Sequence, residues 1–231
     1  MGADAEVGRL VRVAMADPAV QRAGMTTAAQ RNFLVVGGRG GWAQRVVAAF
    51  KLALTDAGEL PNVLEPGFDT DGLQRFSQQV KGVNFDAVFL ALDAREAALI
   101  RPRLARDVPI YGTSQVYAGE GMARTLAQEL AGIRFADMPW LLEPDHPAVM
   151  IYPRPTLVNG QAPDIESLRL YALGIDAYRL AAEWASGRTR FEIDGVTGVL
   201  RVDRAQGVRV ERLPSFAVYR GGRILREDPV R

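Results

Sequence analysis

Short apolar runs alternate with amphipathic segments over the first 131 residues, and this alternation is the strongest constraint on the fold. Ala87–Leu92 is a continuous apolar run, which is typical of a strand buried on both faces. Phe33–Val36 has the same character, and Trp42–Ala57 follows it with apolar residues at helical spacing. Because strands joined through helices pair in parallel, the pattern predicts a parallel sheet with helices on both sides.

The same reasoning predicts further elements in this part of the chain. The first is a helix over Ala5–Val20, whose apolar residues recur three and four positions apart. The other expected elements are a strand at Val63–Leu64, a helix around Leu73–Val80, a helix near Ala94–Leu104, a strand at Val108–Tyr111 and a helix near Gly121–Leu130.

Beyond Gly132 the pattern changes. Ile133–Ala136 is a further expected strand, and an irregular, proline-rich stretch occupies residues 138–163. A long helix is predicted over Asp164–Ser186, with one face formed by Leu168, Tyr171, Ala172, Ile175, Tyr178 and Ala182. Hairpin strands separated by the turn signals Asp194-Gly195, Gln206-Gly207 and Gly221-Gly222 follow it, at Phe191–Ile193, Gly198–Val202 and Phe216–Tyr219.

We therefore expect two lobes. Residues 1–131 form a parallel α/β lobe with an N-terminal helix, and residues 132–231 supply a crossing segment, the long helix and the β-hairpins. One helix and several hairpins bury too little surface to be a separate domain. The second portion is thus expected to complete a partial lobe whose first part lies outside this sequence.

Composition argues against several classes of function. The chain has 28 Lys and Arg against 27 Asp and Glu, so no basic surface for nucleic acid is expected. The absence of Cys excludes thiolate catalysis, and the single histidine, His146, argues against a zinc site. No apolar run approaches the ~20 residues that a membrane-spanning helix needs.

A glycine-rich loop follows the strand Phe33–Val36. Gly38 to Ala43 fits the pattern G-x-G-x-x-A at the start of a helix, where dinucleotide-binding loops hold a pyrophosphate. Arg39 and Trp42 are bulky for such a loop, so we favour a tight structural turn with Trp42 at the edge of a cleft. No cofactor is predicted, and Gly40 and Trp42 are candidates for lining the cleft.

Other candidate ligand contacts follow two of the expected strands. Asp93 comes after Ala87–Leu92, and Thr113, Ser114 and Gln115 come after Val108–Tyr111. Open α/β sheets bind ligands at the carboxyl ends of their strands. Asp93 also precedes Ala94-Arg95-Glu96 in the position of a helix cap, and we favour capping as its role. No catalytic and no metal-binding residue is predicted.

Several segments together resemble the LppC/LpoA family of penicillin-binding protein activators. The most specific are Tyr111–Gly119, which contains Thr-Ser-Gln, and Gly132–Leu142, which contains Asp-Met-Pro-Trp-Leu. Leu170–Tyr178 and Gly195–Leu200 are similar to the closing helix and hairpin of type I periplasmic binding folds. The resemblance runs from about Arg31 to Ile224.

The resemblance implies a type I periplasmic-binding-protein-like α/β fold, a Rossmann-like parallel sheet with flanking helices in two lobes, the first of them incomplete. It also implies a non-catalytic periplasmic regulator that activates a class A penicillin-binding protein in peptidoglycan synthesis. The full-length protein would be attached to the outer membrane through a lipid anchor that these residues lack. The resemblance assigns no residue to the contact with the partner.

The alternative function is a periplasmic solute-binding module for a small polar ligand such as an amino acid or a cell-wall fragment. It predicts a cleft between the lobes that closes on the ligand. The side chains expected to converge there are Thr113, Ser114, Gln115 and either Asp93 or Asp137. A nucleotide-dependent enzyme, the third hypothesis, predicts a pyrophosphate at Gly38 and Gly40.

Overall fold

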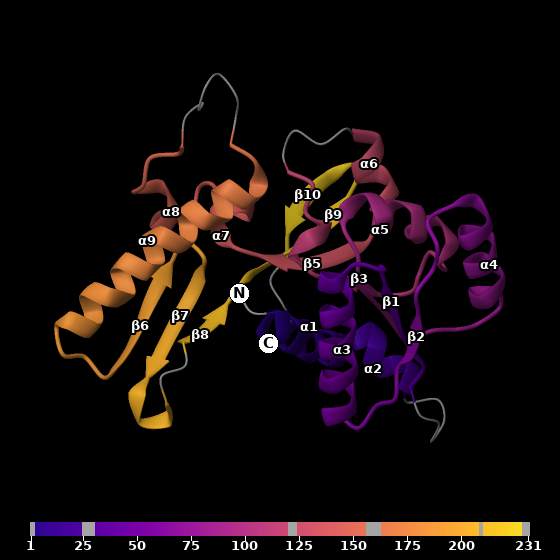
Figure 1. The fold of residues 1–231 in the computed structure, drawn as a ribbon, viewed down its shortest axis with the longest axis horizontal. Coiled ribbons are helices and arrows are strands. Elements are labelled where there is room, and N and C mark those ends of the chain that lie inside the picture. Colours follow the sequence, from indigo (N-terminus) through magenta and orange to yellow (C-terminus); the bar gives the residue numbers. More distant parts are fainter. Residues whose placement is uncertain (1–2, 25–30, 120–123, 156–162, 208–209, 228–231) are drawn as a thin grey trace. The chain divides into compact units, whose positions relative to one another are not determined.

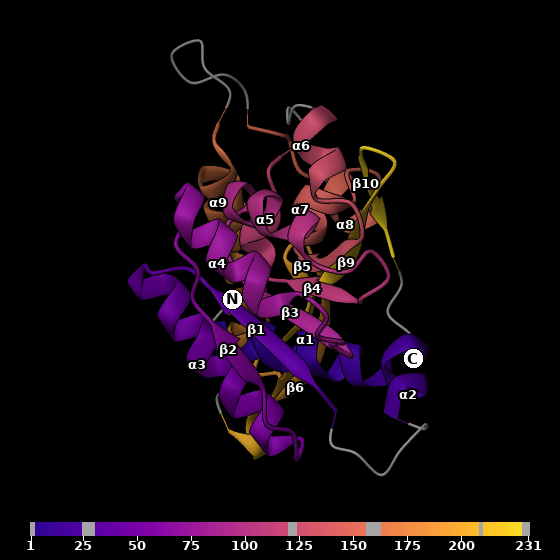
Figure 2. The ribbon, with the colours of Figure 1, turned by 90° about the vertical axis from the view of Figure 1, so that its right-hand side faces the viewer.

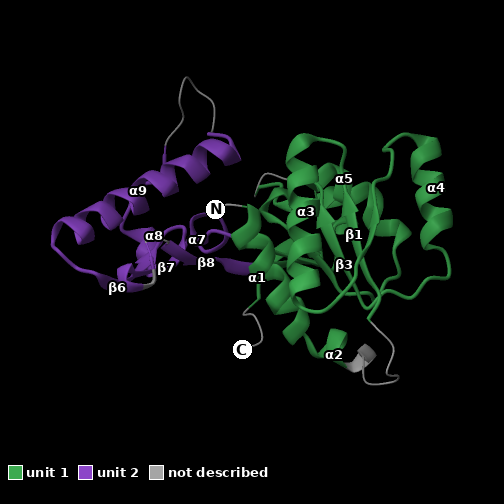
Figure 3. Cartoon of the chain, turned by 60° about the horizontal axis from the view of Figure 1, so that its bottom comes forward, with its two compact units in different colours: residues 1–136, 217–231 green, residues 137–216 purple. Residues whose placement is uncertain are grey.

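The computed structural model describes residues 3–24, 31–119, 124–155, 163–207 and 210–227. The chain forms two compact units, shown in different colours in Figure 3. The first unit comprises residues 1–136 and 217–231, and the second comprises residues 137–216. The chain therefore passes twice between the units, once after Ala136 and once after Phe216.

A seven-stranded sheet forms the centre of the first unit (Figure 1), with the strand order β10-β9-β5-β4-β3-β1-β2. The pairs β1–β2, β1–β3, β3–β4 and β4–β5 are parallel, and β9–β10 is antiparallel. The predicted mostly parallel α/β sheet is thus confirmed. The strands are β1 (Phe33–Gly37), β2 (Asn62–Leu64), β3 (Ala87–Ala91), β4 (Ile110–Gly112), β5 (Ile133–Asp137), β9 (Ser215–Arg220) and β10 (Arg223–Arg226).

Helices cover both faces of this sheet, as the alternation predicts (Figure 2). On one face, α1 (Ala3–Ala16) packs beside α3 (Gly41–Asp56). The other face carries α4 (Thr70–Val80), α5 (Ala94–Ile100) with the 3₁₀ turn η1 (Arg101–Arg103), and α6 (Arg124–Glu129). The start of the helix predicted near Gly121 lies outside the described residues.

The two central strands are buried along their whole length. β1 and β3 pair from Phe33 with Ala87 to Gly37 with Ala91, and every residue of both strands is buried. The ring of Phe89 lies 6.0 Å from Phe33, 5.2 Å from Phe50 and 5.7 Å from Tyr111 between ring centroids. This aromatic cluster joins β1, β3, β4 and α3 into one core.

The N-terminal helix belongs to the core of the first unit. Val7, Leu10, Val11 and Ala14 recur at helical spacing and are buried. Burial of each Leu or Val side chain stabilises the fold by about 1.5–3 kcal/mol. Pro18 does not simply end the predicted helix but begins a second one, α2 (Pro18–Gly24), because its fixed φ suits the first turn of a helix.

A polar cluster ties the N-terminal helices to the last residues of the first unit. The Tyr111 hydroxyl donates to Asp17 at 2.6 Å. Arg134 lies 3.7 Å from Asp17 and donates to Glu227 at 2.8 Å. Burial, together with the bond to Asp17, raises the pKa of Tyr111 far above its ordinary value. The hydroxyl therefore stays protonated and remains a donor at every pH at which the protein is used.

Among its described residues, the second unit combines α-helices with a three-stranded antiparallel sheet of order β6-β7-β8. The described part of the proline-rich stretch, expected to be irregular, contains the short helices α7 (Pro139–Leu142) and α8 (Pro147–Met150). The long predicted helix is present as α9 (Ile165–Ala185). The strands are β6 (Arg190–Gly195), β7 (Gly198–Asp203) and β8 (Val210–Leu213).

The turn between β6 and β7 lies two residues later than the Asp194-Gly195 signal indicates. Gly195 pairs with Gly198, so Val196 and Thr197 form the turn. The buried Asp176 of α9 fixes this position, because it accepts hydrogen bonds from the Val196 N–H at 3.1 Å, the Thr197 N–H at 2.8 Å and the Thr197 hydroxyl at 2.6 Å. A Cβ on Gly195 would lie 2.6 Å from Asp176 Oδ2, so glycine is needed there.

The face of α9 that packs against the unit coincides only in part with the predicted apolar face. The buried residues of α9 are Arg169, Ala172 and Asp176. Tyr178, on the predicted apolar face, is 77% exposed, and Leu170 is 69% exposed. The hydrogen bonds of Asp176 orient the helix, and much of its apolar surface stays uncovered by the residues that the structure describes.

The two units do not follow the predicted division at residue 131, because the last strands lie in the first unit. Residues 217–231, which include most of β9 and all of β10, belong to the first unit. Strand periodicity identifies a strand but does not indicate which sheet it joins. Within the described residues, no helix is long and apolar enough to cross a membrane.

Substitution of Asp176 by Ala is expected to lower the free energy of unfolding by about 3 kcal/mol, because it leaves two buried N–H groups and one hydroxyl without their acceptor. Urea-induced unfolding measures the change. Glu192→Gln, which weakens an exposed ion pair in the same unit, is the matched control and should cost less than about 0.5 kcal/mol. Equal effects of the two substitutions would contradict this role for Asp176.

Candidate functional site

The candidate site residues lie at the carboxyl edge of the sheet in the first unit. β1, β3 and β4 are neighbours in the sheet (Figure 1). β1 lies between β2 and β3, so the chain adds β2 on one side of β1 and then crosses to add β3 on the other. Open α/β sheets bind ligands beside such a change of side. The loops after β1, β3 and β4 carry the predicted residues to this edge, namely Gly40, Trp42, Asp93, Thr113, Ser114 and Gln115.

The loop after β1 is a tight turn that opens α3. Gly38 is buried, and its N–H donates to the Ala91 carbonyl at the end of β3 at 3.3 Å. Gly40 is exposed and is the N-cap of α3, without a side chain to cap it, and Trp42 is half-buried in the first turn. The loop thus joins two strand ends and begins a helix of 16 residues.

A carboxylate lies against this loop. A Cβ built on Gly38 would lie 3.2 Å from Glu96 Oε2 and 3.3 Å from Glu96 Oε1. Burial raises the pKa of Glu96, and the charge of Asp93 adds to the effect, although the bond from the Asp93 N–H opposes it. The Glu96 carboxyl group beside Gly38, and the bond that already engages the Gly38 N–H, disfavour a pyrophosphate here and with it the dinucleotide hypothesis.

Asp93 is occupied by its own helix. Its carboxylate accepts hydrogen bonds from the N–H groups of Arg95 and Glu96, both at 2.8 Å. Glu96 in turn accepts from the Asp93 N–H at 3.2 Å, which completes a capping box at the start of α5. Asp93 therefore has the capping role that its sequence position favours.

The loop after β4 contains the 3₁₀ turn η2 (Ser114–Val116). Thr113 is 1% exposed, and its hydroxyl has no hydrogen-bond partner among the described residues. The Ser114 N–H donates to Glu6 Oε1 of α1 at 2.5 Å, and the Ser114 hydroxyl lies 3.4 Å from Glu6 Oε2. Gln115 is half-exposed. A carboxylate of the chain itself thus occupies the polar groups of Ser114.

Tyr219 of β9 holds the same loop from another side. Its buried hydroxyl donates to the Val116 carbonyl at 2.8 Å and accepts from the Ala118 N–H at 3.3 Å. Because the tyrosine and Glu6 contact residues on both sides of Gln115, they restrain the loop. The β4 loop is therefore pre-organised in the absence of any ligand.

Sequence reasoning missed Glu6, Glu96 and Tyr219 as parts of this edge. A signal for Glu6 was available, since it lies four residues before Leu10 and so falls on the apolar face of its helix. A charged residue on such a face needs a buried partner. Nothing in the sequence indicates the partner, because Ser114 is more than one hundred residues away.

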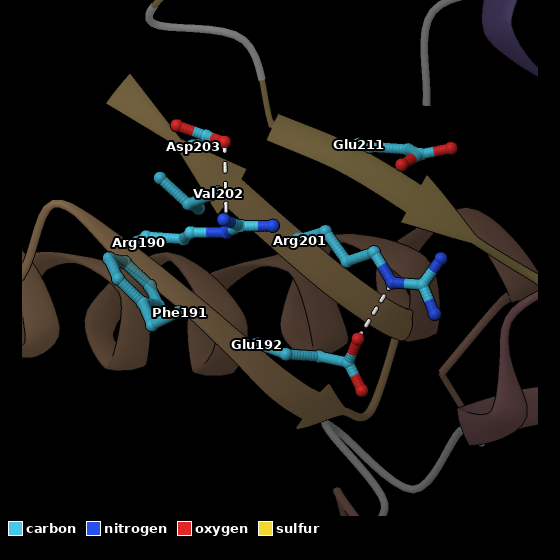
Figure 4. A pocket seen from close by; sticks show the side chains of 7 residues that line it. All are labelled: Arg190, Phe191, Glu192, Arg201, Val202, Asp203 and Glu211. Carbon is cyan, nitrogen blue, oxygen red and sulfur yellow. Dashed lines mark hydrogen bonds and ion pairs between the residues drawn. The ribbon is translucent and has the colours of Figure 1, made fainter. Parts of the chain in front are cut away.

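The second unit has a pocket of about 680 Å³ (Figure 4). Arg201 donates to Glu192 at 2.7 Å, and Arg190 lies 3.7 Å from Asp203. Each of these two arginines of the pocket therefore has a carboxylate partner within it. Such cross-strand pairs are typical of a solvated sheet face. Its lining residues are Arg190, Phe191, Glu192, Arg201, Val202, Asp203 and Glu211.

The remaining polar candidates of the second unit also have local partners. Asp137 pairs with Arg169 at 2.7 Å, and both are buried. Burial lowers the pKa of Arg169, but the charges and hydrogen bonds of Asp137 and then of Glu166 outweigh the effect of burial, so the pKa of Arg169 is raised. His146 accepts from the Ala148 N–H at 3.2 Å and caps α8. Among the described residues, no group of three His, Asp or Glu could hold a metal ion.

Comparison with protein families identifies one that matches most of the chain. Residues 68–222, about two thirds of the sequence, match the family described as "LppC putative lipoprotein". A relative from Yersinia pseudotuberculosis, named "Penicillin-binding protein activator LpoA", is 33% identical over 151 residues. The match covers 62% of this chain and 22% of the relative, so the chain spans about a fifth of that protein.

Two solved structures resemble the fold. A protein from Chromobacterium violaceum, described as "a putative branched-chain amino acid ABC transporter", is 37% identical, with a TM-score of 0.68. The match covers 94% of this chain and 65% of that one. The C-domain of LpoA from Haemophilus influenzae, described as "a regulator of PBP1A", is 20% identical, with a TM-score of 0.68. That match covers 99% of this chain and 68% of the C-domain. The fold is thus of the type I periplasmic-binding-protein-like class.

The raised pKa of Glu96 predicts a pH dependence. A carboxyl group whose pKa is higher in the folded state favours folding while it is protonated, and this contribution is lost as the pH rises through the folded pKa. As the pH rises through the titration of this carboxyl group, the free energy of unfolding of Glu96→Gln is therefore expected to rise relative to that of the parent chain. Chemical unfolding at several pH values measures the difference, and a constant offset would contradict the prediction.

Proposed function

The chain belongs to the LppC family, and from this premise we propose that it is a non-catalytic regulatory module that activates a class A penicillin-binding protein in peptidoglycan synthesis. The match over residues 68–222 carries the proposal. The names of the relatives support it, since LpoA of Yersinia pseudotuberculosis is called an activator and the LpoA C-domain of Haemophilus influenzae a regulator.

The geometry of the first unit supports a non-catalytic function. Asp93 caps α5, the Ser114 N–H is bound to Glu6, and the Glu96 carboxylate lies against Gly38. A catalytic centre needs a nucleophile or base whose proton-accepting atom can reach a substrate. The carboxylates of Asp93 and Glu96 and the N–H of Ser114 instead have partners within the chain, which suits a protein that acts through its surface.

The family description also supports a location in the cell envelope. We infer that the full-length protein is periplasmic and is attached to the outer membrane through a lipid anchor, because the family is described as lipoproteins.

A solute-binding module is the second candidate function. The observation that favours it is the 37% identity with the Chromobacterium violaceum protein described as a branched-chain amino acid ABC transporter. In such a module, Gln115 and Trp42, which are half-exposed at the carboxyl edge, would contact a small polar ligand. The two functions differ in whether a small molecule or a protein is the ligand.

We also propose that the second unit is part of a lobe completed by further polypeptide. On the apolar face of α9, Tyr178 is 77% and Tyr171 37% exposed, and Leu170 elsewhere on the same helix is 69% exposed. Arg212 supports the same proposal, because its Nε atom is buried without a hydrogen-bond partner among the described residues. Burial lowers the pKa of the Arg212 guanidinium, although the charge of Asp176 opposes this shift. The matched structures extend beyond this chain by about a third of their length.

The activator function predicts a gain in the rate of a class A penicillin-binding protein when the chain is added. Glycan polymerisation and peptide cross-linking are measured with and without excess chain, and an equal concentration of an unrelated α/β protein is the control. Amino acids, muropeptides and dinucleotides are tested separately by thermal shift, where a ligand at 100 times its Kd stabilises by about 2.7 kcal/mol. Stabilisation by amino acids without any effect on the synthase would favour the solute-binding module instead.

Lobe completion predicts that the effect of a substitution at Tyr178 depends on chain length. In the 231-residue chain, Tyr178→Glu is expected to change the free energy of unfolding by less than about 0.5 kcal/mol, because this side chain is 77% exposed. In a longer form that contains the whole lobe, the same substitution should cost about 2 kcal/mol or more, because it buries an unpaired charge. Urea-induced unfolding of both forms tests this, and equal effects would contradict the proposal.

A further inference from the structure

β10 forms one outer edge of the seven-stranded sheet in the first unit. It pairs with β9 on one side, and no described strand pairs with its other side (Figure 2). An unpaired edge presents backbone N–H and C=O groups to any extended segment that reaches it. The strand also carries apolar surface, since Leu225 is 42% exposed. β10 therefore has the groups that are needed to accept a further strand.

The turn before β10 decides which backbone groups face outward. Arg220 is opposite Arg223 in the register, so a turn of two glycines with φ of 60° and 73° connects β9 to β10. In such a turn the Arg223 N–H is bonded to the Arg220 carbonyl. Hydrogen-bonded and non-hydrogen-bonded pairs then alternate along the hairpin. Ile224 and Arg226 are consequently the residues of β10 whose N–H and C=O groups point away from β9.

Three arginines surround this turn. Arg220 and Arg223 are exposed and lie directly opposite each other on one face of the hairpin. Arg124 of α6 lies beside the turn, because a Cβ on Gly222 would lie 3.2 Å from the Arg124 Cγ. None of the three has a carboxylate partner among the described residues. Like charges opposite each other destabilise a strand pair, so the arrangement costs the isolated hairpin stability and favours an anionic partner.

The same charges argue against a second copy of this chain as the occupant of the edge. If β10 paired with β10 of another copy around a twofold axis, the arginines of both strands would lie side by side. Like charges across a strand pair repel, and charged side chains on an edge strand protect it from such self-association. An acidic segment replaces this repulsion by attraction.

We propose that β10 and the arginines around its turn form a docking site for an extended acidic segment of a protein partner, which joins the sheet as an additional strand. The backbone groups of Ile224 and Arg226 bind the segment, and Arg124, Arg220 and Arg223 select acidic side chains. That the partner is the class A penicillin-binding protein rests on the function proposed above. The site itself rests on the geometry of the hairpin.

A short peptide of alternating Glu and Val residues, blocked at both ends, tests the site in the absence of the synthase. At physiological ionic strength, it is expected to shift the amide resonances of Ile224 and Arg226 saturably, with a Kd on the order of 0.1–1 mM. The same peptide with every backbone nitrogen methylated has equal charge but cannot donate to β10, so its affinity should be at least about tenfold lower. Equal affinities of the two peptides for the parent chain would overturn strand addition.

Charge reversal tests the arginines. Arg220→Glu combined with Arg223→Glu is expected to weaken binding of the acidic peptide by about tenfold or more, and a peptide with Lys in place of Glu should bind this double variant better than it binds the parent chain. Arg75→Glu combined with Lys81→Glu makes the same change of net charge at exposed positions in and after α4. This matched control should change the affinity by less than about twofold, because distant charges are screened.

The same variants separate this proposal from the activator function. If the parent chain stimulates the synthase and the variant with Arg220→Glu and Arg223→Glu does not, both are supported. If the two stimulate equally, the docking proposal is overturned and the activator function stands. If the parent chain does not stimulate, the activator function fails, and the peptide measurements alone decide the site. Binding of phosphatidylglycerol vesicles through these arginines, without binding of the acidic peptide, would assign the site to a membrane surface and overturn the proposal.

Discussion

The parallel pairing of β1 with β3 is the constraint on which the first unit depends. Both strands are buried along their whole length, so their backbone groups must find hydrogen-bond partners within the sheet. β2 on one side and β4 on the other supply these partners. The helices then cover faces that would otherwise expose continuous apolar surface, and the loops at the carboxyl edge take their positions from the strand order.

The carboxyl edge of this sheet is the place where related architectures bind ligands, yet here its polar groups serve the fold. A capping box uses Asp93, α1 supplies the acceptor for Ser114, and Tyr219 restrains the turn that begins at Ser114. Such an edge is rigid and largely satisfied. A regulator needs a stable surface of defined shape more than a reactive cleft, and an edge with these properties is compatible with that requirement.

Local patterns predicted most of the secondary structure, and non-local contacts account for what they missed. The apolar run Ala87–Leu92 identifies β3 because burial on both faces leaves a direct trace in the sequence. The turn between β6 and β7 was misplaced because Asp176, on another element, decides its position. At the site, the capping by Asp93 was predictable from four consecutive residues, whereas the bond between Glu6 and Ser114 joins segments whose proximity only the fold creates.

The first unit is discontinuous in sequence, since residues 217–231 return to it after the second unit has been formed. A chain growing from its N-terminus completes the five parallel strands β1 to β5 before β9 and β10 are made. Until then, the outer edge of β5 has no neighbour, and an unpaired edge invites association with other chains. During synthesis this edge of β5 therefore stays open until β9 has been made, and a truncation that removes β9 and β10 would leave it open in the finished chain.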